Sequence, residues 1–133
     1  MKQTVAPQHP QCLLVVDDQL HARQAVAACL TAAGHRVKVA GNGLDALAAA
    51  HGDSPNAVVL DVHVPIAACL ATATALHQNI FTTRMKIVLR SAMPEADLRA
   101  LFPVCDAFVD ERSFDALINA IATVGAMPIC TPS

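Results

Sequence analysis

The sequence lacks the features that mark several common classes of protein. Only 15% of its 133 residues are charged and the formal net charge is -2, which disfavours both disorder and a surface that coats nucleic acid. No apolar run approaches the ~20 residues that cross a bilayer, and residues 1–11 lack the apolar middle of a signal peptide. We therefore expect a cytoplasmic protein that neither inserts into a membrane nor binds nucleic acid directly.

Cysteine signatures are also missing. The five cysteines form no CxxC pair and no Cys/His cluster at zinc spacing, and their number is odd. We expect reduced, mostly buried thiols at Cys12, Cys29, Cys69, Cys105 and Cys130.

What the sequence does contain is a regular alternation of apolar segments. Short strand-like runs at 12–16, 36–40, 57–60, 86–90 and 106–109 are followed by helix-like stretches at 19–34, 42–52, 67–77, 94–102 and 114–124. Asn42 and Ser113 are expected to cap helix starts, and Gly34 and Gly52 to end helices. Such alternation predicts a parallel sheet covered on both faces, because right-handed crossovers place the helices there.

The predicted fold is therefore a flavodoxin-like, doubly wound α/β domain of five parallel strands, (βα)5. Its 133 residues, 54% of them hydrophobic, suit a single packed domain. We expect a flexible lead-in at 1–11, the folded domain at 12–124 and a tail at 125–133.

Acids stand where predicted strands end. Asp17 and Asp18 follow the first strand, Asp61 ends the third and Ser91 ends the fourth, at the sheet edge where doubly wound folds bind ligands. Two carboxylates about 4 Å apart repel by roughly 4 kcal/mol at an effective dielectric of about 20. A divalent cation relieves that repulsion, and Mg²⁺ favours such oxygen ligands and attracts phosphoryl groups. The pattern predicts phosphate chemistry without a P-loop.

Each of these residues has a simpler interpretation when it is taken alone. The Asp-Asp pair could cap the following helix, Asp61 could be an ordinary turn residue, and Ser91 could supply a hydroxyl at a helix start. Their joint placement after three strands favours one shared site.

The sequence resembles the receiver domain of two-component response regulators over residues 12–124. The segments LLVVDD, NGLDAL, VVLDVHVP, LRSA and DAFV, together with Arg23, occur in the family's order and near its spacings. The resemblance implies that Asp61 accepts a phosphoryl group from a phosphohistidine on a sensor histidine kinase or phosphotransfer protein. It also implies Mg²⁺ bound by Asp17, Asp18, Asp61 and the backbone carbonyl of His63.

Two further roles are implied by the same resemblance. Ser91 would be the switch hydroxyl that turns toward the phosphoryl group, and Phe108 would be the aromatic switch on the fifth strand. With phosphorylation the domain would change its affinity for a downstream protein. A homodimer through the fourth helix, fifth strand and fifth helix is a further expectation. Val109, Leu117 and Ile121 are candidates for its surface, with membership of the core as the alternative for each.

One position departs from the family pattern. Glu111 stands where the family has a lysine that contacts the acceptor, and Arg112 replaces the following proline. Either Glu111 points to solvent while Arg112 or Arg90 supplies the cation, or the contact is lost; rescue by Arg112 would require the loop to shift. The alternative function is a docking module that works without phosphorylation. A phosphate-ester hydrolase is disfavoured because no separate general acid is evident.

Overall fold

A computed structural model describes residues 10–63, 65–79, 82 and 84–126. The expected lead-in at 1–11 and tail at 125–133 lie mostly outside these residues, as does Cys130. Of the described helices, none combines the length and the apolar character needed to cross a bilayer.

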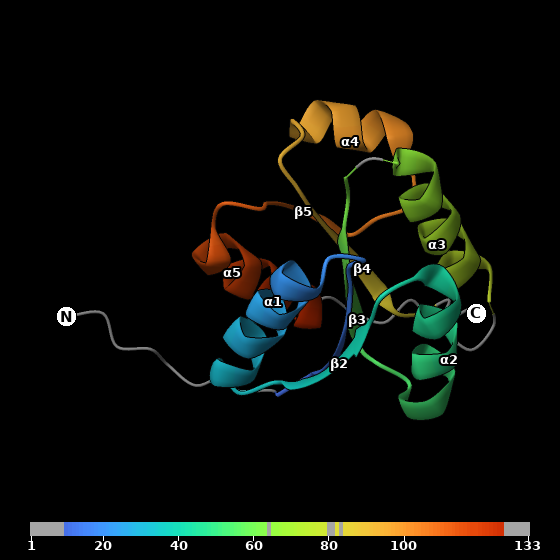
Figure 1. The fold of residues 1–133 in the computed structure, drawn as a ribbon. Helices are drawn as coiled ribbons and strands as arrows, with labels where there is room; N and C mark the ends of the chain where they lie inside the picture. Colours follow the sequence, from blue (N-terminus) through green and yellow to red (C-terminus); the bar gives the residue numbers. More distant parts are fainter. Residues whose placement is uncertain (1–9, 64, 80–81, 83, 127–133) are drawn as a thin grey trace.

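The five strands form one parallel sheet in the order β2-β1-β3-β4-β5. They are β1 (Cys12–Val16), β2 (Arg36–Ala40), β3 (Ala57–Asp61), β4 (Lys86–Ser91) and β5 (Ala107–Asp110). The helices are α1 (Leu20–Ala32), α2 (Gly43–Asp53), α3 (Ile66–Gln78), α4 (Glu95–Leu101) and α5 (Phe114–Gly125). The predicted flavodoxin-like (βα)5 fold is confirmed (Figure 1).

Two layers of core cover the two faces of the sheet, because successive strand residues point to opposite sides. Val59 and Val88 pack with α1 and α5, whereas Leu60 and Leu89 pack with α2, α3 and α4. Figure 1 shows α1 and α5 on one side of the sheet and α2 and α3 on the other. The same alternation sends the side chains of Asp61 and Arg90 toward α1 and α5, and the side chain of Ser91 toward the opposite face.

The helix ends follow most of the local signals. The side chains of Asn42 and Ser113 each accept the backbone N–H three residues on, as expected of N-caps. Gly34 has φ 100° and closes α1 in a left-handed turn. The expectation for Gly52 is wrong: α2 continues to Asp53, and Ser54, with φ 47°, takes the left-handed position.

Two expectations about burial are also wrong. Val109, Leu117 and Ile121 are 4%, 0% and 0% exposed, so they belong to the core beneath α5 and offer no docking surface. The four described cysteines are free thiols that are only partly buried, and Cys69 and Cys105 pack against the edge of the core.

Candidate functional site

A pocket of about 230 Å³ lies at the carboxyl edge of the sheet, beyond the ends of β1 and β3. The three acids predicted to lie together all line it, with backbone from the β2–α2 turn and side chains from the start of α3 completing the wall. Its lining comprises Asp17, Asp18, Asp61, His63, Cys69 and Thr72, among others. The parallel strands bring together residues that are more than forty positions apart in the sequence.

Asp17 also organises the turn from β1 into α1. Its Oδ1 accepts the backbone N–H of Gln19 at 3.0 Å, and its own carbonyl accepts a hydrogen bond from Arg23 Nη1 at 3.0 Å. The helix cap expected as an alternative is not formed, because Gln19 is the N-cap of α1 and no side chain caps the helix; Asp17 holds only the turn that precedes it. The Asp17 side chain is only 2% exposed, whereas that of Asp18 is 60% exposed. The two adjacent acids thus differ in how easily they meet solvent.

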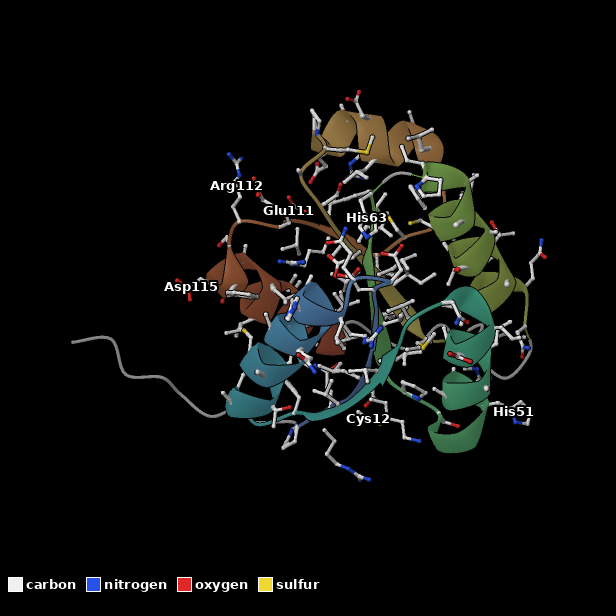
Figure 2. The ribbon with its side chains drawn as sticks, in the orientation of Figure 1. Cys12, His51, His63, Glu111, Arg112 and Asp115 are labelled. Atoms are coloured by element: carbon white, nitrogen blue, oxygen red, sulfur yellow. The ribbon has the colours of Figure 1, made fainter. Side chains whose placement is uncertain are left out.

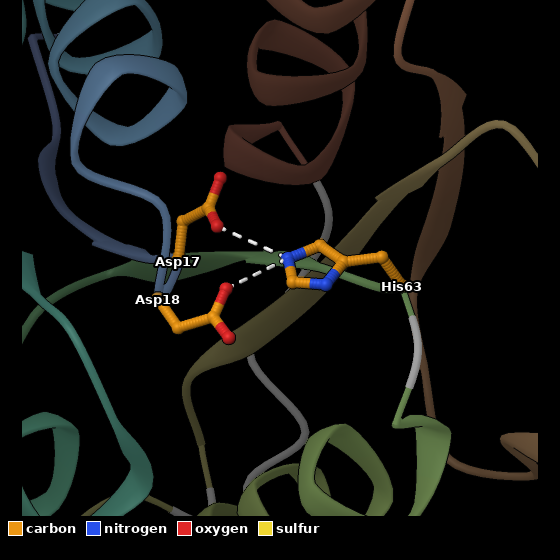
Figure 3. Close-up of side chains that lie close together, drawn as sticks. All are labelled: Asp17, Asp18 and His63. Atoms are coloured by element: carbon orange, nitrogen blue, oxygen red, sulfur yellow. Dashed lines mark hydrogen bonds and ion pairs between the residues drawn. The ribbon is translucent and has the colours of Figure 1, made fainter.

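The imidazole of His63 lies between the two acids (Figure 3). Its Nε2 is 3.1 Å from Oδ1 of Asp17 and 3.1 Å from Oδ1 of Asp18. Sequence reasoning considered only the His63 carbonyl, which here accepts a weak hydrogen bond from the Cys69 thiol at 3.7 Å. The sequence did hold a signal for the contact between this ring and the two acids. A histidine two residues after the acid that ends β3 has a side chain that can turn back over the ends of the strands.

The pKa values of Asp17 and Asp61 are shifted in opposite directions. Burial, and after it a hydrogen bond with Asp17, raise the pKa of Asp61 to about 7 against the opposing charge of Arg90. Burial also raises the pKa of Asp17, but hydrogen bonds with Asp61, the Gln19 N–H and His63 outweigh it, so this pKa is lowered. The two carboxyls therefore act as a coupled pair in which Asp61 holds the proton and Asp17 accepts it.

Arg90 makes the closest charged contact with Asp61. Its Nη1 lies 2.6 Å from Asp61 Oδ1, and its Nη2 donates to the carbonyl of Glu111 at 2.9 Å. Asp61 and Arg90 are directly paired in the register of β3 and β4, and their side chains are 3% and 10% exposed. Among the described residues, Asp61 Oδ2 and Arg90 Nε are buried and have no hydrogen-bond partner.

The position after β5 does not bring a side chain to Asp61. Glu111 is exposed, and only its backbone carbonyl reaches into the site, to Arg90. Arg112 pairs with Asp110 through Nε at 3.0 Å and Nη2 at 2.6 Å, and its side chain is 82% exposed. Figure 2 shows Arg112 pointing out from the β5–α5 turn. Of the cations considered from sequence, Arg90 is therefore the one that meets Asp61.

Ser91 and Phe108 lie on the other face of the sheet from Asp61. The Ser91 hydroxyl donates to the carbonyl of Val62 at 2.8 Å and accepts the N–H of Met93 at 3.1 Å. Phe108 is half-buried against the core beneath α3 and α4, and the guanidinium carbon of Arg99 lies 4.6 Å from its ring centroid. The structure thus gives both residues defined partners in this state, and neither hydroxyl nor ring contacts Asp61.

The donor set at this edge suits a divalent cation. One ligand atom each from Asp17, Asp18 and His63 lie within 4.8 Å of one another, and Asp61 contributes a buried carboxylate oxygen without a donor. Carboxylate oxygens are the ligands that Mg²⁺ favours, whereas an imidazole nitrogen is more typical of transition metals. The oxygens fit Mg²⁺, with the His63 ring as the group that a cation must displace from the two acids.

Comparisons with known proteins identify a family and similar folds. A family model described as the response regulator receiver domain matches residues 13–108. Chemotaxis protein CheY4 of Vibrio cholerae is 20% identical, with a TM-score of 0.79 over 87% of this chain and 99% of that chain. A receiver domain from Methylobacillus flagellatus is 22% identical, with a TM-score of 0.73 over 87% and 99% of the two chains.

A longer protein contains a similar domain. NtrX of Brucella abortus is 26% identical, with a TM-score of 0.73 over 88% of this chain but only 27% of its own. The structural likeness extends over most of the described residues. No curated protein sequence matches the chain.

Proposed function

The chain belongs to the response regulator receiver domain family, and from this membership we propose that Asp61 accepts a phosphoryl group from a phosphohistidine. The donor would be a sensor histidine kinase or a phosphotransfer protein. The observation that supports the proposal is the Asp61 carboxylate itself, which ends β3 in the shared pocket with Oδ1 held by Arg90 and Oδ2 without a partner among the described residues. Arg90 anchors one oxygen, and the other can react once the proton that Asp61 shares with Asp17 has left.

In the proposed transfer, an Asp61 oxygen forms the new O–P bond while the P–N bond of the phosphohistidine breaks. The electron pair of that bond returns to the imidazole nitrogen of the donor. Mg²⁺, when held by Asp17, Asp18, Asp61 and the His63 carbonyl, would offset the charge of the phosphoryl oxygens. Asp17 and Asp18 orient the site, and the coupled proton of Asp61 must leave before its carboxylate can attack.

Phosphorylation would change the conformations of Ser91 and Phe108. A phosphoryl group adds close to two negative charges and strong acceptor oxygens. These oxygens would compete with the Val62 carbonyl for the hydrogen bond that the Ser91 hydroxyl donates. A turn of Ser91 would draw the β4–α4 loop toward the site, and the ring of Phe108 would leave Arg99 and follow it. The domain then acts by a shift between two surface states, as a signalling domain and not as a hydrolytic enzyme.

The change of surface would alter the affinity of the domain for another protein in the cytoplasm. In α4, the loop after it and α5, the exposed large apolar side chains are Leu101, Val104 and Phe114, which are 38%, 39% and 41% exposed. Leu101 and Val104 border a groove beside α3, and Phe114 begins α5. They replace Val109, Leu117 and Ile121 as the candidates for contact with a downstream protein or with a second copy of the chain. Light scattering with and without beryllofluoride would detect a phosphorylation-dependent dimer.

A docking module that works without phosphorylation remains the second candidate, favoured by one observation. Each acid of the pocket already has a positively charged or ionisable partner, His63 for Asp17 and Asp18, and Arg90 for Asp61. Because the negative charges of the acids are already balanced, the site could stabilise the fold without binding a metal or a phosphoryl group.

Acetyl phosphate with Mg²⁺, followed by intact mass spectrometry, separates the two candidates. We expect one phosphoryl adduct on the wild type and none on Asp61→Asn. Beryllofluoride with Mg²⁺ should move the NMR signals of Ser91 and Phe108 in the wild type only. The absence of any adduct on the wild type, or an adduct that persists in Asp61→Asn, would exclude Asp61 as the acceptor.

A further inference from the structure

Arg90 is a buried cation at a strand position that is otherwise part of the core. Its neighbours along β4, Val88 and Leu89, are both fully buried apolar residues. An arginine there must bring its charge out of water, which is strongly unfavourable unless the charge is paired and its donors are used. The side chain meets both conditions by reaching the carboxyl edge of the sheet, where Asp61 and the Glu111 carbonyl accept from it.

The direction of Arg90 follows from strand register. Asp61 and Arg90 are paired neighbours on β3 and β4, and both side chains point toward the α1 and α5 face. The guanidinium carbon also lies 5.6 Å from the ring centroid of Phe114, the first residue of α5. Strand, turn and helix therefore hold the guanidinium from three sides, so it is fixed in place before any ligand arrives.

The contact uses only one oxygen of Asp61. Arg90 Nη1 binds Oδ1 at 2.6 Å, and the second nitrogen, Nη2, is taken by the Glu111 carbonyl and not by Oδ2. A planar guanidinium often binds a carboxylate through two parallel hydrogen bonds, and here the Glu111 carbonyl prevents that pairing. The arrangement distinguishes the two oxygens of Asp61, and Arg90 Nε keeps a donor without a partner among the described residues.

We propose that Arg90 is the charge-compensating residue of the phosphorylation site, holding Asp61 through Oδ1 so that Oδ2 receives the phosphoryl group. This inference rests on the proposed function. It assigns to β4 a positive charge that the family pattern places after β5, where this chain has the exposed Glu111. Glu111 contributes to the site only through its backbone carbonyl, which orients Arg90.

The test compares matched arginine variants under acetyl phosphate and Mg²⁺. Arg90→Met should slow formation of the Asp61 adduct roughly 100- to 1,000-fold, in line with the loss of one fixed donor at a reacting centre. Arg112→Met removes an arginine from the same rim that pairs with Asp110 instead, and its rate should equal that of the wild type. Thermal melting of each variant in the same buffer establishes that it is folded.

A second pair of variants separates a chemical role from a structural one. Glu111→Lys, added to Arg90→Met, should restore part of the lost rate, because a long lysine side chain can turn inward from a position whose backbone carbonyl already reaches the site. Arg90→Lys keeps the charge with a shorter reach, and we expect a rate between those of the wild type and Arg90→Met. Arg90→Lys also decides the question if Arg90→Met does not fold, because it keeps a cation at this buried position.

Three results would overturn the inference, and they differ from one another. Equal rates for the wild type and Arg90→Met would leave Asp61 as the acceptor but remove Arg90 from the reaction. A faster rate in Arg90→Met would show that Arg90 blocks Asp61, as the docking-module alternative requires. No adduct on any variant would mean that the proposed function has failed, and the role of Arg90 with it.

Discussion

Replacing Asp61 by asparagine should stabilise the metal-free protein at about pH 8. The carboxyl is 4% exposed, and its pKa is raised from 3.8 to about 7. At about 1.4 kcal/mol for each pKa unit, a rise of roughly 3 units means that the ionised form costs about 4 kcal/mol of folding free energy. Asparagine keeps Oδ1 as the acceptor for Arg90 and supplies an N–H that can donate to Asp17, while the loss of the charged partner of Arg90 offsets part of the gain.

We expect the free energy of unfolding to rise by about 2 to 4 kcal/mol, which corresponds to about 7 to 14 °C in Tm for a domain of this size. The gain must depend on pH. Because the folded-state pKa of Asp61 is raised, its contribution to stability is present below pH 3.8 and is lost as the pH rises through about 7. The variant and the wild type should therefore be nearly equal near pH 4 and differ fully at pH 8.

Thermal and urea unfolding in EDTA, followed by circular dichroism between about pH 4 and 8, would measure this difference. Mg²⁺ provides the control, because a ligand at roughly 100 times its Kd stabilises the protein that binds it by about 2.7 kcal/mol. Added Mg²⁺ should stabilise the wild type and reduce the difference in unfolding free energy between it and Asp61→Asn. A variant that is less stable than the wild type at pH 8 without metal would refute the reasoning, since Arg90 would then outweigh burial and Asp17.

Two histidines lead to further predictions. His63→Ala should tighten Mg²⁺ binding severalfold in a calorimetric titration, because Nε2 no longer competes for the two acids that it contacts at 3.1 Å; weaker binding would mean that the ring helps to hold the metal. His35 is 6% exposed, its Nδ1 accepts the N–H of Gln11 at 3.1 Å, and burial lowers its pKa below 6.5. The unfolded state then binds more protons, so stability should fall as the pH drops below 6.5. His35→Asn keeps an acceptor without titrating, and its unfolding free energy should lose less between pH 7 and 5; an identical loss would assign the pH dependence to another group.

Local sequence signals were sufficient for the architecture. Uninterrupted apolar runs such as 57–60 predicted buried parallel strands, and Asn42 and Ser113 predicted two helix starts, because such caps depend on a hydrogen bond to a residue three positions away. The shared pocket of Asp17, Asp18 and Asp61 was also predictable, since parallel strands end at the same edge of a sheet. The expectation that Gly52 ends α2 is wrong, because the helix continues to Asp53 and Ser54 takes the left-handed position.

Which side chains complete the site was decided only by the tertiary structure. From the sequence alone, the positive charge beside Asp61 could come from Arg90, from Arg112 or from neither. The face toward which a strand residue points depends on the register of the neighbouring strands and not on the identity of the residue. Register places Arg90 beside Asp61, and local pairing with Asp110 holds Arg112 in solvent. His63 lies between two acids more than forty positions earlier in the chain because the ends of β1 and β3 are adjacent. The sequence determined the acids and the edge on which they meet; the packed sheet determined which cationic and imidazole groups face them.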